Sequence, residues 1–310
     1  MELTRGVYSE PEDTLLTSMA LDYLAAGPAD VVDLIGHVCS LPGAPRIVAE
    51  HMAHAMFSGR REFVRGVDGR WRLDLNAKPQ VERPVVYSRT RSALVSESER
   101  LRDLSYAVVD TETTGGGRRS GDRITEIAAV IVRNGEIVEV FETLVNPQRS
   151  IPYFVTQLTN ITWDMVKNAP TFDRIVPDVM RVLEGNVFVA HNATFDWGFV
   201  TSELSRSTGR RLHGRRLCTV KIARKVLPQL SRRSLDHIAR YYGVEIRGRH
   251  RAGGDAIATA KCLLRMFLDL QDRGCETWGD LATLLRTPGA LRKKRRPSGL
   301  PTPVLRDTTA

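Results

Sequence analysis

The sequence at residues 106–115 is YAVVDTETTG, in which four apolar residues are followed by a polar segment with two acids. A compact apolar run of this length is typical of a buried strand. Further strands are predicted over residues 124–132 and 136–144, joined through an Asn-Gly turn at 134–135. A fourth apolar run, at 187–190, lies among stretches with helical spacing. This order predicts an α/β domain in which helices flank a mixed sheet.

The N-terminal quarter has a different pattern. Apolar residues recur at helical spacing in three short stretches, and strand-like segments at 62–66 and 70–73 are joined through Asp68-Gly69. Three helices followed by a hairpin resemble a winged helix, so we expect a small winged-helix-like α+β domain at residues 1–75. Its third helix carries few basic residues, so docking of a protein partner or dimerisation is as reasonable as contact with DNA.

Composition sets the other boundaries. Residues 76–103 contain prolines and have weak periodicity, which predicts a linker. The α/β domain is then expected at 104–272, followed by an extension at 273–310 with a basic, disordered tail.

The overall composition excludes several classes of protein. Hydrophobic residues make up 42% and charged residues 26% of the 310 residues, which excludes a mainly disordered chain. No apolar run approaches the ~20 residues of a membrane span, and the acidic N-terminus does not resemble a signal peptide. We therefore expect a cytoplasmic protein without a membrane partner. The four cysteines are scattered and are predicted to be free thiols.

The net charge of +9 is concentrated in two places. Residues 202–251 contain 14 basic and 3 acidic side chains, and residues 287–310 contain 6 and 1. Such an excess indicates a polyanionic partner. We expect the first segment to track phosphates, with Arg215, Arg216 and Arg251 as candidate substrate-binding residues.

Four acids and one histidine form a candidate metal site. Asp110 and Glu112 lie on the same side of a strand, where two close carboxylates repel each other unless a cation lies between them. Asp196 follows the strand at 187–190, and Asp255 lies in the first turn of a helix after His250. Carboxylates without cysteine favour magnesium or manganese over zinc. Two such ions suit phosphodiester cleavage, and a histidine can accept a proton from water near neutral pH.

One family carries these motifs in the same order. Residues 104–270 resemble the DEDDh class of 3′-to-5′ exonucleases, the family of the bacterial DNA polymerase III epsilon (proofreading) subunit. The resemblance is carried by Asp110-x-Glu112, Asp196 and His250-x4-Asp255, within DTETTG at 110–115 and HNATFD at 191–196. It implies a ribonuclease H-like fold.

The resemblance also implies a role for each residue. The four acids would hold two Mg²⁺ ions, which Mn²⁺ could replace, with Asp110 bridging both. His250 would deprotonate the attacking water, releasing a nucleoside 5′-monophosphate. Glu112 would also contact the terminal 3′-hydroxyl, while Thr111 and Phe195 would pack against the last bases.

Two segments depart from the family pattern. Gly116-Gly117, followed by two arginines, replaces a bulky apolar residue that the family often places beside the terminal base. This difference leaves open how the protein holds the end of a nucleic-acid strand and which ends it selects. Gly253-Gly254 predicts a mobile loop around His250.

The expected function is therefore metal-dependent 3′-to-5′ hydrolysis of nucleic acid with a free 3′ end, in proofreading, repair or turnover. DNA with single-stranded or frayed ends is favoured, and an exoribonuclease or oligonucleotidase is the alternative. A non-catalytic nucleic-acid-binding or regulatory protein is a lower alternative, because no ligand residue is missing. The N-terminal domain could bind a DNA polymerase or another protein, although a stand-alone enzyme is slightly favoured.

Overall fold

The computed structural model describes residues 4–11, 14–57, 60, 62–74, 94–95 and 97–287. These residues form two compact units. The larger unit lies within residues 1–8, 92–203 and 214–310, and the smaller one within 9–91 and 204–213. Most of the predicted linker and the predicted basic tail lie outside the described residues.

Five strands form the central sheet of the larger unit, in the order β11-β9-β6-β7-β8. Their bounds are β6 Tyr106–Thr113, β7 Ile124–Arg133, β8 Glu136–Leu144, β9 Val187–Ala190 and β11 Arg216–Cys218. β6 is antiparallel to β7 and parallel to β9, which confirms the predicted mixed sheet. Because β8 and β11 also run in the direction of β6, the carboxyl ends of four strands meet at one edge.

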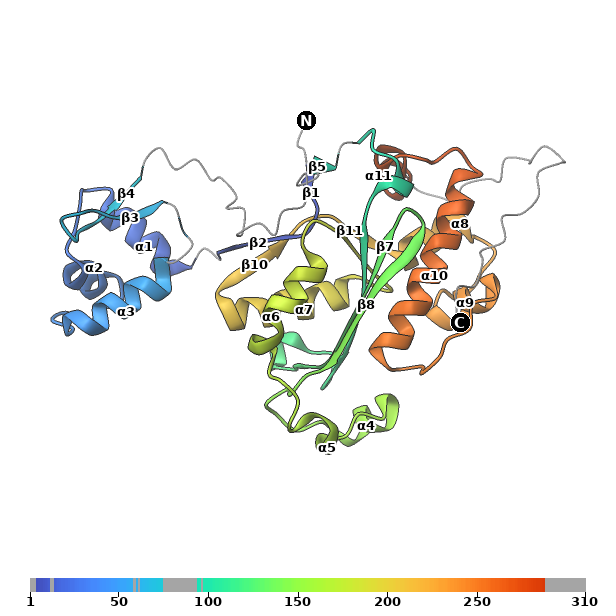
Figure 1. The fold of residues 1–310 in the computed structure, drawn as a ribbon, viewed down its shortest axis with the longest axis horizontal. Helices are drawn as coiled ribbons and strands as arrows, with labels where there is room; N and C mark the ends of the chain where they lie inside the picture. The colour runs from blue at the N-terminus through green and yellow to red at the C-terminus, as the bar shows by residue number, and fades with distance from the viewer. Residues whose placement is uncertain are drawn as a thin grey trace. The chain divides into compact units, whose positions relative to one another are not determined.

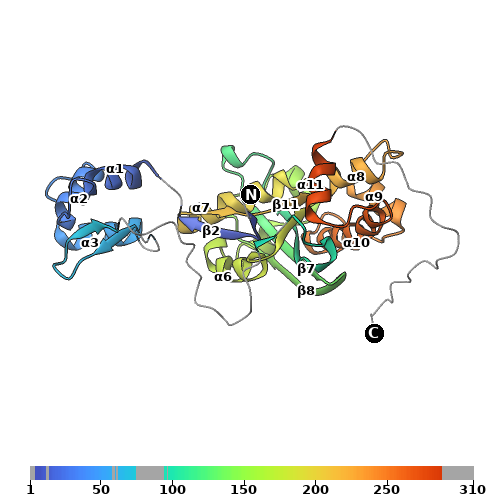
Figure 2. The same cartoon turned by 90° about the horizontal axis from the view of Figure 1, so that it is seen from above.

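Different helices cover the two faces of this sheet. Tyr106 and Val108 of β6 share an apolar cluster with residues from α8 Thr219–Val226, α9 Leu235–Tyr242 and α10 Ala252–Gln271. Figures 1 and 2 show α6 Phe172–Leu183 and α7 Thr194–Thr208 on the opposite face. Strand periodicity therefore directs the even-numbered residues of β6 toward α10 and the odd-numbered ones toward α7.

Shorter elements complete the larger unit. α4 Tyr153–Thr159 and α5 Trp163–Val166 follow β8, and α11 Trp278–Arg286 follows α10. β1 Thr4–Arg5 pairs with β5 Leu94–Val95. Within the described part of the chain, no helix has the length and apolar character needed to cross a membrane.

The smaller unit contains three helices followed by a hairpin, in the predicted order. The elements are α1 Leu15–Leu24, α2 Val31–Val38, α3 Arg46–Phe57, β3 Phe63–Arg65 and β4 Trp71–Leu73. The ring of Phe57 lies 4.3 Å from that of Phe63 and 5.1 Å from that of Trp71, centre to centre. The third helix is thus packed directly on the hairpin. The sequence did not predict the pairing of β2 Tyr8–Pro11 with β10 Arg210–His213.

Candidate active site

The predicted acids converge at the edge where the parallel strands end. Asp110 and Glu112 lie at the end of β6 and face α10, whereas Asp196 and Asp255 lie in the first turns of α7 and α10. Ligand atoms of Glu112, His250 and Asp255 lie within 4.8 Å of one another. Three segments that are remote in sequence therefore deliver five candidate catalytic side chains to one place.

Asp196 is fixed by the strand that carries the other acids. Its Oδ1 atom accepts hydrogen bonds from the Thr111 backbone N–H, at 3.0 Å, and from the Thr111 hydroxyl, at 2.9 Å. Thr111 is buried, so its visible role is to orient Asp196, and the predicted base contact stays a prediction. Phe195, the other predicted base contact, is half-buried, with its ring 4.9 Å from that of Phe199.

The acids repel one another when all are ionised. Burial, together with the charges of Asp196, Asp255 and Glu112, raises the pKa of Asp110 well above its usual range. Burial and the charge of Asp255 raise the pKa of Glu112 to about 7, and burial raises that of Asp196 to about 7. Burial also raises the pKa of Asp255. Desolvation favours the protonated form of all four acids, and like charge adds to this at Asp110 and Glu112, whereas a bound cation would favour the ionised form.

The donor set fits a hard divalent cation. Its ligand atoms are carboxylate oxygens with one imidazole, and no cysteine is among them. The Oδ1 atom of Asp255 is buried and accepts no hydrogen bond from the described residues. A buried carboxylate oxygen without a partner is costly, and a metal ion would satisfy it.

Arg249 is a cation in the site that the sequence analysis missed. Its guanidinium donates hydrogen bonds to the Oδ2 atom of Asp255 and, at 2.9 Å, to the Oδ1 atom of Asp236 in α9. The only sequence signal was its place next to His250 in the basic segment. Arg249 thereby compensates part of the negative charge and links the loop before α10 to α9.

His250 lies in a tightly packed loop. Its φ of 62° is in the left-handed region, which is uncommon for a residue other than glycine. A Cβ atom at Gly254 would lie 1.8 Å from the Arg247 carbonyl oxygen, and one at Gly253 would lie 2.1 Å from a Glu142 carboxylate oxygen. The close approach to backbone explains Gly254, and the mobility predicted for this loop stays a prediction.

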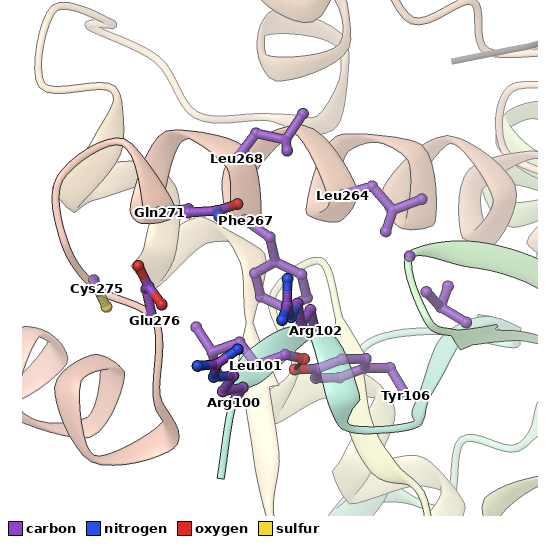
Figure 3. Close-up of a pocket in the computed structure, with 12 residues that line it drawn as sticks. Arg100, Leu101, Arg102, Tyr106, Leu264, Phe267, Leu268, Gln271, Cys275 and Glu276 are labelled. Atoms are coloured by element: carbon purple, nitrogen blue, oxygen red, sulfur yellow. Dashed lines mark hydrogen bonds between the residues drawn. The ribbon is translucent and has the colours of Figure 1, made fainter. Parts of the chain in front are cut away.

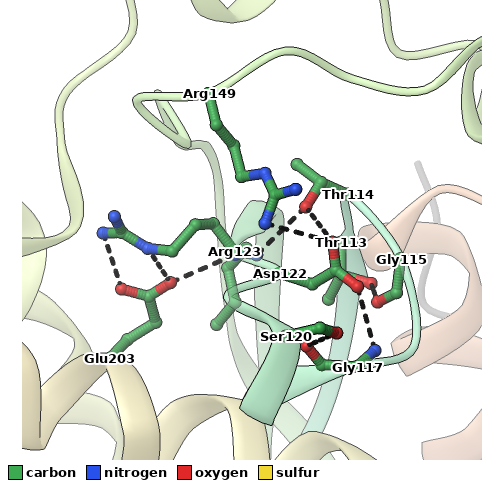
Figure 4. A network of polar contacts seen from close by, with 10 residues as sticks. Thr113, Thr114, Gly115, Gly117, Ser120, Asp122, Arg123, Arg149 and Glu203 are labelled. Carbon is green, nitrogen blue, oxygen red and sulfur yellow. Dashed lines mark hydrogen bonds and ion pairs between the residues drawn. The ribbon is translucent and has the colours of Figure 1, made fainter.

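The loop that follows Glu112 is held by a polar network (Figure 4). Asp122 accepts hydrogen bonds from the Thr114 hydroxyl and the Gly117 N–H, both at 2.9 Å. Next to it, Arg123 forms a bidentate ion pair with Glu203 of α7, with a shortest distance of 2.7 Å. The Gly-rich segment that lacks the family's apolar residue is therefore braced by hydrogen bonds.

The predicted phosphate contacts are not gathered at the acids. Arg216 begins β11 and Arg215 precedes it, at the end of the strand opposite the catalytic edge. Arg216 is exposed, and its guanidinium lies 5.0 Å from the ring centre of Trp197, which follows Asp196 in α7. Arg215 is buried, with its guanidinium 4.3 Å from the Trp278 ring centre, so it is poorly placed to bind phosphate. Arg251 does lie beside the site, but its guanidinium is paired with Glu126. The charge count showed which segment of the sequence is basic, but not where its side chains lie in the structure.

A separate apolar pocket lies at the other end of the sheet (Figure 3). It is lined by Tyr106, which begins β6, and by Gln271, which ends α10. The acids lie at the opposite ends of both elements, so this pocket is not part of the candidate active site.

Comparison with known proteins identifies the larger unit. The RNase T exonuclease family matches residues 107–263, just over half of the chain. A DNA polymerase III of the PolC type from Clostridium perfringens is 39% identical over 179 residues, 58% of this chain and 12% of that protein. A putative bifunctional exonuclease/endonuclease of Mycobacterium tuberculosis is 40% identical over 193 residues, 60% of this chain and 30% of that protein.

Further similarities cover the same region. The 3′-5′ exonuclease DinG of Bacillus subtilis is 37% identical over 166 residues, 54% of this chain and 18% of that protein. The chain thus spans less than a third of the length of these three relatives. A structure of exonuclease X in complex with 5′ overhanging duplex DNA is 28% identical and matches 59% of this chain and 99% of its own, with a TM-score of 0.45. The family match includes all four acids and His250, and the chain therefore belongs to the RNase T exonuclease family, with a 3′-to-5′ exonuclease domain of the DEDD type.

Proposed function

We propose that this protein shortens DNA from single-stranded or frayed 3′ ends and releases nucleoside 5′-monophosphates. The observation that carries the proposal is the convergence of four acids and His250 at one sheet edge, with the buried Oδ1 atom of Asp255 lacking a hydrogen-bond partner among the described residues. Such a site suits hydrolysis of a phosphodiester.

The acids and the histidine would divide the chemistry between them. Asp110, Glu112, Asp196 and Asp255 would hold two Mg²⁺ ions, or Mn²⁺ in their place. When bound, these ions would stabilise charge on the attacking and leaving oxygens. His250 would accept the proton of the attacking water, because an imidazole can do so near neutral pH.

DNA is favoured as the substrate because relatives with 34–40% identity include DNA polymerases of the PolC type. The same geometry could cleave RNA, because the acids act on the phosphodiester and not on the base. Proofreading with a polymerase, repair and turnover are all compatible with this activity.

Removing one of the acids should stop hydrolysis without preventing the protein from binding DNA. We expect Asp110→Ala or Asp255→Ala to abolish cleavage of a 5′-labelled oligonucleotide in single-turnover assays while filter binding stays within a few-fold of wild type. His250→Ala should slow the chemical step by ~10² to 10⁴, the usual contribution of a general base. Wild-type cleavage by Asp110→Ala would contradict the site.

Substrate preference can be measured on matched ribo- and deoxyribo-oligomers of one sequence. With Mg²⁺ present, kcat/KM should be higher for the deoxyribo-oligomer. A higher kcat/KM for the ribo-oligomer would reverse the assignment to DNA and favour the exoribonuclease alternative.

The raised pKa values predict how stability depends on pH and metal. Between about pH 4 and 7, the folded metal-free protein binds more protons at Glu112 and Asp196 than the unfolded chain does. These two acids should therefore lower the free energy of unfolding as pH rises through this window. Mg²⁺ should raise Tm more at pH 8 than at pH 6, because fewer protons then compete for the acids.

The metal effect should depend on the site. Asp196→Asn should reduce the increase in Tm caused by Mg²⁺, whereas Asp178→Asn, a change of an exposed acid in α6, should leave it as in wild type. An equal Mg²⁺ effect at both pH values and in both variants would show that the ion binds elsewhere.

A further inference from the structure

The N-terminus of α10 is capped by another part of the chain. Its N-cap residue, Arg251, makes no side-chain cap hydrogen bond. Instead, the Ala252 N–H donates to the Oε2 atom of Glu126 in β7, at 2.8 Å. A carboxylate at this position also interacts favourably with the positive end of the helix dipole. Glu126 thus supplies the missing cap from a strand 126 residues earlier in the sequence.

The same carboxylate binds the residue before the helix. The Nε atom of Arg251 lies 3.1 Å from both oxygens of Glu126, and its Nη2 atom donates to Oε1. Glu126 is 1% exposed, and a buried charge of this kind needs a well-arranged partner. The pair therefore docks the start of α10 onto β7.

This anchor lies next to a predicted metal ligand. Glu126 is directly opposite Glu112 in the antiparallel register of β6 and β7. Like charges in facing positions repel each other, and the charge of Glu126 contributes to the raised pKa of Glu112. Pairing with Arg251 neutralises Glu126 and directs it toward the helix.

His250 is held from both sides in a strained conformation. Arg249, before it, is tied to Asp236 in α9, and Arg251, after it, is tied to Glu126 in β7. A left-handed backbone at a histidine persists only where neighbouring contacts impose it. The two ion pairs supply such contacts.

We propose that Glu126 is a positioning residue for hydrolysis: through Arg251 and the Ala252 N–H, it sets the placement of His250 and Asp255 relative to Glu112. The inference rests on the proposed function. It assigns the guanidinium of Arg251 to the anchor rather than to the phosphate contact predicted from the sequence.

The kinetic test compares Glu126→Gln with Glu62→Gln. Both glutamates are paired with an arginine, but Glu62 pairs with Arg60 in the smaller unit. Glu126→Gln should lower kcat on a DNA oligomer by ~10- to 100-fold, as is usual for groups that orient metal-site residues, with KM within about twofold of wild type. Glu62→Gln should keep kcat within about threefold of wild type.

Variants of Arg251 test whether the pair acts as a unit. Arg251→Ala should also lower kcat at nearly constant KM, and Arg251→Lys should recover part of it. Combining Arg251→Ala with Glu126→Gln should reduce kcat no further than the more severe single change, because both changes remove the same ion pair.

Hydrogen exchange gives a readout independent of activity. In the metal-free protein, the Ala252 amide should exchange faster in Glu126→Gln than in wild type, and Glu62→Gln should not change it. If Glu126→Gln is too unstable for kinetics, the exchange rate of the Ala252 amide can be compared between Arg251→Lys and wild type instead.

The results that would overturn the proposal are distinct from those that would overturn the function. If Arg251→Ala raises KM and flattens the salt dependence of binding while Glu126→Gln keeps wild-type kcat, Arg251 is a phosphate contact and the anchor has no positioning role. If the wild-type protein degrades no oligomer, the proposed function fails, and hydrogen exchange still decides whether the anchor holds the loop.

Discussion

The burial of four carboxylates at one place is the constraint on which the larger unit depends. Burial raises the pKa of Asp110, Glu112, Asp196 and Asp255, and like charge adds to the rise at Asp110 and Glu112. Only a rigid scaffold can keep such groups in place. The buried sheet, the helices on both faces and the bonds from Thr111 to Asp196 provide that scaffold. The same burial of negative charge favours the divalent cations on which the proposed chemistry relies.

Much of the fold could be predicted because its signals are local. The apolar runs before Asp110 and before His191 marked two strands of the sheet, and the Asn134-Gly135 turn marked the hairpin between β7 and β8. The acids could be found because each follows a strand or begins a helix, so topology brings them together. Local pattern was enough for the strands, and the resemblance to the DEDDh exonucleases supported the choice of the acids.

The supporting contacts could not be predicted, because they join distant segments. Glu126 meets Arg251 across 125 positions, and within the β7 segment it is one acid in an apolar strand. From the sequence, Arg249 could be recognised only as one basic residue among several. The place of Arg215 could not be predicted for a related reason: a charge count says that a residue is basic, whereas strand direction and burial decide which surface it reaches. Arg215 is buried and Arg249 and Arg251 are held by acids, so these three add to the charge total without being free to meet nucleic acid.

The site also spans both faces of the sheet. Asp110 and Glu112 point toward α10, whereas Thr111 between them turns toward α7 and binds Asp196 there. The candidate site therefore lies between two helical layers and takes side chains from a helix of each layer, α7 and α10. Residues 145–171, which carry α4 and α5, bring none of the acids. This stretch still supports the site from outside, because its Arg149 forms an ion pair with Asp122, which holds the loop after Glu112.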